Sequence, residues 1–85
     1  MTTSNTKILR VGYYALLREQ RGLSEESLDT SAATAADLYR HLKATHGFSL
    51  EADQLKVAIN DSFKPWDTVL APGDRVVFIP PVAGG

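Results

Sequence analysis

The 85-residue chain contains no cysteine, which excludes disulfides, thiolate zinc sites and iron–sulfur clusters within it. It also lacks a dominant charge, because nine Lys and Arg residues are balanced by ten Asp and Glu residues, for a formal net charge of −1. Without a basic run to hold phosphates, neither nucleic acid nor an anionic membrane is an expected partner. No stretch approaches the roughly 20 apolar residues of a membrane span, and Met1–Thr6 lack the apolar segment of a signal peptide. We therefore expect a soluble, cytoplasmic, single-domain protein.

Signatures of an internal active site are missing as well. His41 and His46 are the two histidines, and on a helix this spacing turns their side chains roughly 140° apart, so they cannot bind one ion together. Three aspartates lie at predicted turns, where an Asp side chain bonds local backbone. They are Asp61, Asp67 and Asp74. There is no Gly-x-Ser-x-Gly elbow and no Gly-rich phosphate loop, so we expect no permanently bound cofactor, no metal and no enzyme acting alone.

One long helix is predicted from Thr34 to the residue before Gly47. Thr34 can cap its N-terminus while Asp37 supplies the acidic half of a capping box, and Gly47 can end it. Apolar residues at i, i+3, i+4 and i+7 form a single stripe that can cover a sheet. The stripe comprises Ala35, Leu38, Tyr39 and Leu42.

The other segments have the patterns of short strands and turns. In chain order we expect a strand at 8–14, a short helix at 15–21, a weak edge strand at 26–30, a strand at 55–60, a short segment at 67–70 and a last strand at 76–79. Alternation places Leu9, Val11 and Tyr13 on one face of the first strand. Gly22 can end the short helix, and Leu28 alone is expected to reach the core from the edge strand.

This order of elements is typical of an α+β fold in which the last strand lies beside the first, parallel to it, with the helix over one face. The last strand is apolar on both faces, which predicts Val76 and Phe78 toward the helix and Val77 and Ile79 toward the open side. An exposed apolar patch around Ile79 would then mark a partner surface. In the alternative, this face is closed by Phe63, Trp66 or a loop.

The last strand is followed by a tail that cannot continue the sheet. Pro80 and Pro81 have no N–H for a ladder, so the chain must leave. The residues that follow are uncharged and progressively smaller: Val82, Ala83, Gly84 and Gly85. Fully extended, the tail spans at most ~20 Å, and two residues without Cβ can enter a narrow channel. We expect residues 1–6 to be a disordered extension, 7–79 the domain and 80–85 a flexible tail with a reactive terminal carboxylate; the alternative is an inert, frayed terminus.

The sequence Pro80-Pro-Val-Ala-Gly-Gly85, preceded by Pro72-Gly-Asp74 and a Val/Phe/Ile strand, resembles the MoaD/ThiS family of ubiquitin-like sulfur carriers, which includes small subunits of molybdopterin synthase. The resemblance runs from the strand at Leu9 to Gly85. It implies a β-grasp fold, with a mixed four- to five-stranded sheet, one main helix on one face and a flexible C-terminal tail.

In this family, an E1-like activating enzyme adenylates the terminal carboxylate with ATP, and a sulfur donor such as a cysteine desulfurase or a rhodanese-like protein then displaces AMP. The resemblance therefore implies a thiocarboxylate on Gly85 that donates sulfur to cyclic pyranopterin monophosphate in the active site of the large synthase subunit. It also implies a heterotetramer of two small and two large subunits. Gly85 would be the reacting residue, Gly84, Ala83 and Val82 would line the route in, Pro80 and Pro81 would stiffen the root, and Ile79 and Val77 would contact the large subunit.

Other functions remain compatible with the same residues. The tail could carry sulfur for thiamine synthesis, tRNA thiolation or cysteine synthesis, or it could form isopeptide bonds as a protein modifier. A non-covalent β-grasp binding module, with an inert terminus and a working sheet face, is an alternative of a different class.

Overall fold

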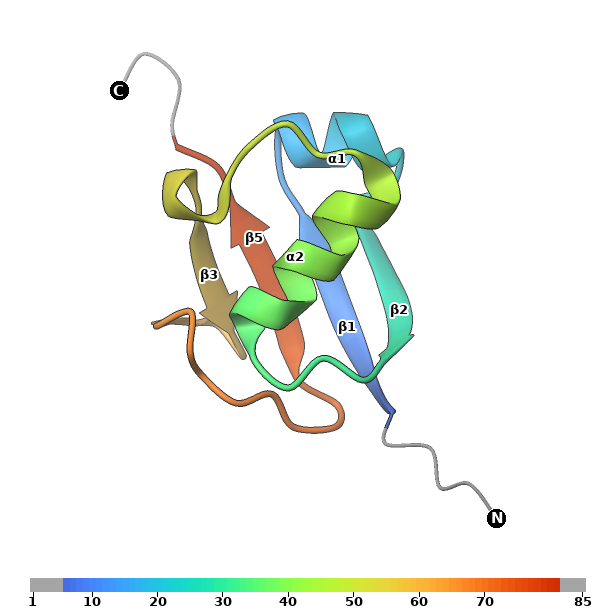
Figure 1. The fold of residues 1–85 in the computed structure, drawn as a ribbon, viewed down its shortest axis with the longest axis vertical. Coiled ribbons are helices and arrows are strands. Elements are labelled where there is room, and N and C mark those ends of the chain that lie inside the picture. The colour runs from blue at the N-terminus through green and yellow to red at the C-terminus, as the bar shows by residue number, and fades with distance from the viewer. Residues whose placement is uncertain (1–5, 82–85) are drawn as a thin grey trace.

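The computed structural model describes residues 6–81, and the expected tail positions Val82, Ala83, Gly84 and Gly85 lie outside the described residues, as does most of the expected extension at 1–6. The elements follow one another as β1 (Lys7–Tyr13), α1 (Leu16–Arg21), β2 (Glu25–Thr30), α2 (Ala35–His46), the 3₁₀ turn η1 (Ala52–Gln54), β3 (Lys56–Ile59), β4 (Ser62–Lys64) and β5 (Arg75–Ile79) (Figure 1). No helix among these described residues has the length and apolar character that crossing a membrane requires.

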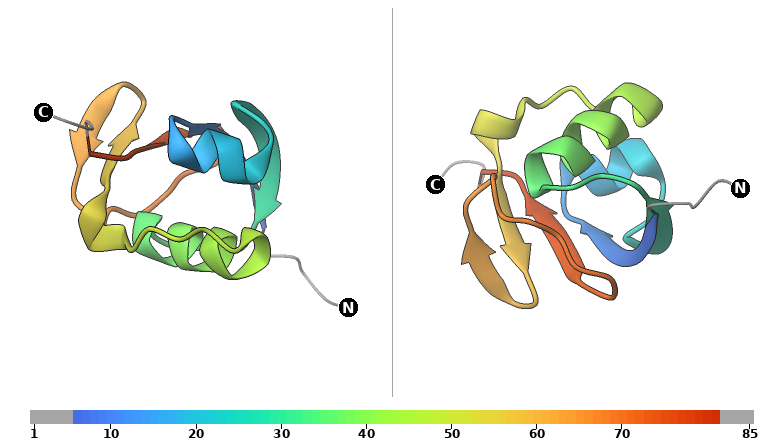
Figure 2. Two further views of the ribbon diagram at one scale, coloured as in Figure 1. Left: turned by 90° about the horizontal axis from the view of Figure 1, so that it is seen from above. Right: turned by 60° about the horizontal axis from the view of Figure 1, so that its bottom comes forward.

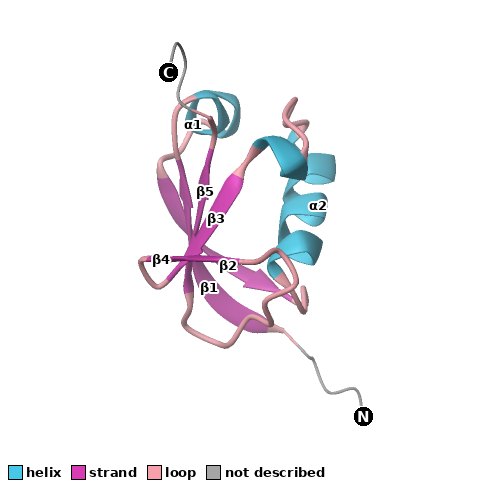
Figure 3. Cartoon of the chain, turned by 90° about the vertical axis from the view of Figure 1, so that its left-hand side faces the viewer, coloured by secondary structure: helices cyan, strands magenta, loops and turns pink. Residues whose placement is uncertain are grey.

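In the described part of the chain, the strands form one five-stranded sheet in the order β2-β1-β5-β3-β4. β5 is parallel to β1 and antiparallel to β3, while the outer pairs β1–β2 and β3–β4 are antiparallel. Helix α2 lies across one face of this sheet, and the other face is uncovered (Figures 2 and 3). The ubiquitin-like α+β fold expected from the sequence is therefore confirmed, including the parallel pairing of the first and last strands.

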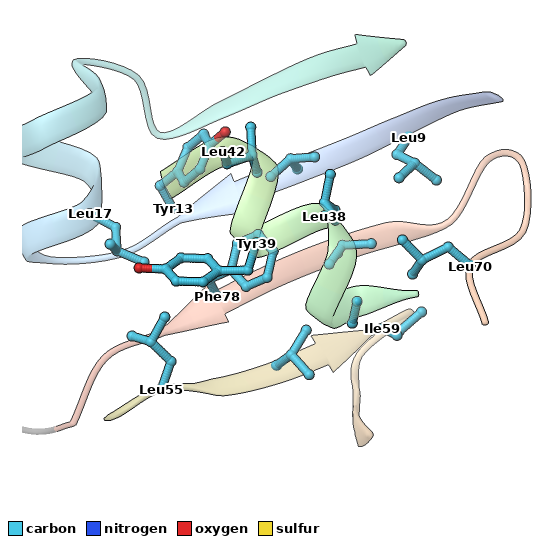
Figure 4. Close-up of a cluster of buried hydrophobic side chains, with 14 of the residues drawn as sticks. Leu9, Tyr13, Leu17, Leu38, Tyr39, Leu42, Leu55, Ile59, Leu70 and Phe78 are labelled. Atoms are coloured by element: carbon cyan, nitrogen blue, oxygen red, sulfur yellow. The ribbon is translucent and has the colours of Figure 1, made fainter. Parts of the chain in front are cut away.

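The core lies between α2 and the covered face of the sheet (Figure 4). Leu9, Val11 and Tyr13 of β1 are at most 1% exposed, as their alternation predicts. The predicted helical stripe is buried to the same extent. Phe78 is fully buried, with ring-centroid distances of 5.2 Å to Tyr39 of α2 and 5.9 Å to Trp66.

The helix ends follow the capping chemistry expected from the sequence. The Thr34 hydroxyl accepts a hydrogen bond from the Asp37 N–H at 3.2 Å. The Asp37 carboxylate itself pairs with Arg40 one turn on, so only the Thr34 half of the predicted capping box is formed. Gly22 and Gly47 end α1 and α2 in the left-handed conformation, with φ of 84° and 71°.

One short strand was not predicted, and one local expectation is wrong. The strand that follows β3 is β4, whereas residues 67–70 contribute a single bridge between Val69 and Thr34. β4 escapes a pattern search because it has three residues, all of them exposed. At the edge strand β2, Leu28 is not alone in facing inward: Thr30 is 7% exposed, and its hydroxyl accepts a hydrogen bond from the Ala32 N–H.

Ala15 joins β1 to α1 in a backbone conformation that favours glycine, with φ 53° and ψ −124°. Such strain in a non-glycine residue costs about 1–3 kcal/mol, and the exposed methyl group of Ala15 returns little packing energy. We therefore expect Ala15→Gly to raise the free energy of unfolding by about 1 kcal/mol, after the larger backbone entropy of unfolded glycine is subtracted. Urea unfolding measures this. Ala71→Gly, at an exposed loop position without positive φ, is the control that should lose stability; a loss at Ala15 as well would contradict the strain argument.

Candidate functional site

The tail leaves the domain from the middle of the sheet. β5 is hydrogen-bonded on both sides, to β1 and to β3, and its last residue, Ile79, is followed by Pro80 and Pro81. Because neither proline can donate to a ladder, the chain separates from both neighbouring strands at this point. Two-sided pairing therefore fixes the position of Ile79, the residue that precedes the two prolines.

The open face of the sheet below this point is apolar at its centre. The register brings Gly12, Val77, Ala58 and Phe63 into one row across four strands. Gly12 is closely apposed to Val77, since a Cβ at position 12 would lie 3.2 Å from the Val77 Cγ2. Val77 is only 6% exposed, so the expectation that it forms exposed surface is wrong: its neighbours in the sheet bury it although no helix covers that face.

Exposed apolar surface is contributed instead by Ile8, at the start of β1 and 60% exposed, and by three further positions. Phe63 of β4 is 68% exposed, and Tyr14, which directly follows β1, is 51% exposed. Ile79 is half-buried. We call Tyr14, Phe63 and Ile79 the outer-face patch. Trp66, the other residue considered as a cover, lies on the helix side, stacked on Phe78.

Phe63 and Tyr14 are candidate site residues that sequence reasoning missed. A signal for Phe63 was present in Asn60 and Asp61, which form the two-residue turn between β3 and β4 with φ of 53° and 73°. Such turns usually join paired strands, so residue 63 could have been placed opposite Ala58. Tyr14 carried no comparable signal, because its position depends on where β1 ends.

A chain of ion pairs borders the patch on the open face. Glu25 accepts from Arg10 at 2.9 Å and from Arg75 at 3.4 Å, and Arg75 also contacts Asp61 at 3.1 Å. Hydrogen bonds from Arg10 and Arg75 lower the pKa of Glu25. These exposed pairs contribute little to stability, but they leave this half of the face polar and electrically balanced.

The two histidines, His41 and His46, both belong to α2. Among residues 6–81, no group of three or more His, Asp or Glu side chains is placed to hold a metal ion. His46 ends α2 and packs on Phe48 with ring centroids 5.7 Å apart, beside the cluster in which Arg21 binds Glu26 through both carboxylate oxygens. Burial, followed by the Arg21 charge, lowers the pKa of His46.

A lowered histidine pKa means that the unfolded chain binds the proton more readily than the folded one. The folded protein therefore keeps its full stability above pH 6.5, the ordinary pKa of histidine. Its stability falls as the pH drops from 6.5 toward the lower pKa of His46 in the folded state. We expect His46→Leu to flatten this part of the pH–stability curve, as followed by thermal unfolding. His41→Leu, at an exposed position of the same helix, should change the curve less, because the His41 charge is the smallest of the influences on the His46 pKa; equal effects of the two variants would refute the assignment to His46.

Comparison with known proteins identifies the family to which this chain belongs. The ThiS family matches residues 11–85 of the chain. The chain belongs to the ThiS family. The molybdopterin synthase sulfur carrier subunit of Haemophilus influenzae is 37% identical over 82 residues, which cover 92% of this chain and 100% of the relative.

Solved structures share the fold of this ThiS-family chain. The HVO 2177 protein of Haloferax volcanii has a TM-score of 0.81 and 28% identity, and the match covers 100% of this chain and 92% of that one. SAMP1 from Haloferax volcanii, a small archaeal modifier protein, has a TM-score of 0.74 and 25% identity, with coverage of 92% and 99%. The ThiS-family chain is thus similar to a molybdopterin synthase sulfur carrier subunit and also to a protein modifier.

Proposed function

We propose that this ThiS-family chain carries sulfur as a thiocarboxylate on Gly85 and donates it in the synthesis of molybdopterin. The observation that carries the proposal is a central strand that is paired on both sides and is followed directly by Pro80 and Pro81. The residues after these prolines are small and end in Gly84-Gly85. The 37% identity to a molybdopterin synthase sulfur carrier subunit supports the choice of pathway.

The chemistry needs a substitution at phosphorus followed by a substitution at the Gly85 carbonyl carbon. A Gly85 carboxylate oxygen attacks the α-phosphorus of ATP on an E1-like activating enzyme, pyrophosphate leaves, and an acyl-adenylate forms. A sulfur nucleophile from a cysteine desulfurase or a rhodanese-like donor then attacks the carbonyl carbon, and AMP leaves with the electron pair. Because the donor reacts as a persulfide, this attack leaves an acyl disulfide between Gly85 and the donor. A thiolate then attacks the donor-side sulfur, the S–S bond breaks, and the Gly85 thiocarboxylate leaves with the electron pair while the thiolate and the donor sulfur form a disulfide. ATP is consumed as a substrate of the activating enzyme.

The outer-face patch is our candidate for the surface that meets the large subunit of molybdopterin synthase. Phe63 and Ile79 lie on the open face, and Tyr14 lies at the sheet edge where the tail begins. A partner that covers these side chains would bury apolar surface and would at the same time receive the tail in its active site. We propose two such small subunits on a dimer of large subunits, with cyclic pyranopterin monophosphate as the sulfur acceptor.

Intact mass spectrometry tests the proposed function. The purified chain is incubated with ATP, an activating enzyme of the molybdenum pathway and a sulfur donor. We expect a mass increase equal to replacement of one oxygen by sulfur, and none when ATP is omitted. An increase seen only with an activating enzyme of thiamine synthesis or tRNA thiolation would move the chain to another sulfur pathway. No increase with any of these enzymes would leave the non-covalent binding module as the better interpretation.

A second candidate function is protein modification, favoured by the similarity to SAMP1. The same acyl-adenylate would then be captured by a lysine of another protein as an isopeptide. Tryptic peptides that carry a Gly-Gly remnant on lysine, found with the wild-type chain and absent without the activating enzyme, would establish it.

A further inference from the structure

Lys56 lies on the open face of the sheet, beside the outer-face patch. The register pairs Lys56 with Ile79, and residues directly opposite each other on antiparallel strands point to the same face. The next pair, Val57 and Phe78, is buried in the core under α2, so Lys56 and Ile79 point the other way. Lys56 is exposed, and together with Phe63 it lines a hollow of about 300 Å³ at this side of the sheet. An ammonium group therefore borders two of the three patch residues.

The charge of Lys56 has no counter-charge within the described chain. The cationic side chains that the described strands place on the open face are Arg10, Arg75 and Lys56. Arg10 and Arg75 share Glu25 as an ion-pair partner, whereas Lys56 forms no ion pair among residues 6–81. In the strand order, Glu25 and Lys56 are separated by three strand spacings, about 14 Å. This separation exceeds the Debye length of about 8 Å at physiological ionic strength, so the Lys56 charge remains available to a partner.

A partner that covers Phe63 and Ile79 also removes water from the neighbouring Lys56 ammonium group. A charge that loses its water without gaining a counter-charge is strongly unfavourable. A carboxylate of the partner offsets this cost, whereas a basic side chain at the same place would repel Lys56. The partner surface that fits this face is therefore apolar where it meets the patch and acidic opposite Lys56.

We propose that Lys56 is a specificity-determining contact, and that the large subunit of molybdopterin synthase places a carboxylate opposite it. The inference rests on the proposed function, which supplies the large subunit as the partner. Phe63 and Ile79 provide apolar contact area that many surfaces could cover. The ion pair of Lys56 with the carboxylate selects among those surfaces and fixes the orientation of the bound subunit.

Binding of the full chain to the large subunit tests this proposal, measured by isothermal titration calorimetry without ATP or an activating enzyme. We expect Lys56→Gln to raise the Kd at least about five-fold and Lys56→Glu at least about 30-fold, in the range of charge pairs at protein interfaces. Both variants should keep the wild-type midpoint of thermal unfolding, because the side chain is exposed.

Lys64→Glu is the matched control. Lys64 also lines the hollow and also lacks an ion pair among residues 6–81, but it is the register partner of Val57 and so belongs to the helix side of the sheet. We expect Lys64→Glu to change the Kd less than about two-fold, because solvent screens its charge from a partner on the open face.

Replacements on the large subunit identify the acidic partner of Lys56. Exposed Asp and Glu residues around the mouth of its active site are changed to Lys one at a time. One of these changes should improve the binding of Lys56→Glu at least about ten-fold and weaken the binding of the wild-type chain, as a direct charge pair requires. If none of them does so, the proposed ion pair is refuted.

Wild-type affinity of Lys56→Glu for the large subunit would overturn the inference and leave the proposed function standing. Equal losses for Lys56→Glu and Lys64→Glu would also overturn it, because a change in net charge would then explain both. A loss of affinity for the activating enzyme alone would assign Lys56 to that enzyme instead. If the wild-type chain itself does not bind the large subunit, the proposed pathway fails together with this inference.

Discussion

Removal of Gly85 is expected to abolish sulfur transfer while the domain keeps its stability. The reacting carbonyl would be displaced by one residue, about 3.3 Å of extended chain, and misplacement by far less than this is enough to cost large factors in rate. The core of the described residues 6–81 is built from other positions, so we expect its contacts to remain. We expect no thiocarboxylate mass shift and no synthase activity, with an unchanged midpoint of thermal unfolding.

A matched variant tests the width of the tail while its length and its terminal group stay the same. Gly84→Val keeps the length and the terminal carboxylate, but it adds a branched side chain to the part of the tail that must enter a narrow channel of the partner. We expect it to lose synthase activity and to fold normally. A folding defect in the Gly85 deletion, or full synthase activity of Gly84→Val, would contradict the proposed role of the tail.

Replacement of Phe78 by alanine is expected to have the largest effect on stability. The ring is fully buried and packs between Tyr39 of α2 and Trp66 of the loop that follows β4. Loss of a buried aromatic ring costs about 3–5 kcal/mol, a large part of the 5–15 kcal/mol that is typical of a whole domain. Chemical unfolding followed by far-UV circular dichroism measures the change in the free energy of unfolding.

Phe63→Ala is the matched control, because it removes the same side chain from a position that is 68% exposed on the same sheet. We expect a change in the free energy of unfolding within about 0.5 kcal/mol, together with at least about ten-fold weaker binding to the large subunit if Phe63 is a central contact. A loss of less than about 1 kcal/mol for Phe78→Ala would show that the core relaxes around the cavity.

Local sequence patterns predicted most of the fold. The alternation of Leu9, Val11 and Tyr13, and the cap residues Thr34 and Gly47, each depend on neighbours within a few positions in the chain, and the structure shows them where they were expected. β4 was missed because three exposed residues carry no periodic pattern. Val77 was misjudged because burial on an open sheet face depends on the strands beside it, which are far away in sequence.

The sequence by itself determined the chemical character of the tail, the capped helix and the apolar strand that must end at Pro80, since these follow from residue types and their spacing. Only the tertiary structure decided what surrounds the base of the tail. The order β1-β5-β3 brings Tyr14 to the same edge as Ile79 and sets Lys56 opposite it. Pairings of this kind join residues more than 20 positions apart, and no local pattern encodes their register, because it is set by the packing of the whole sheet against α2.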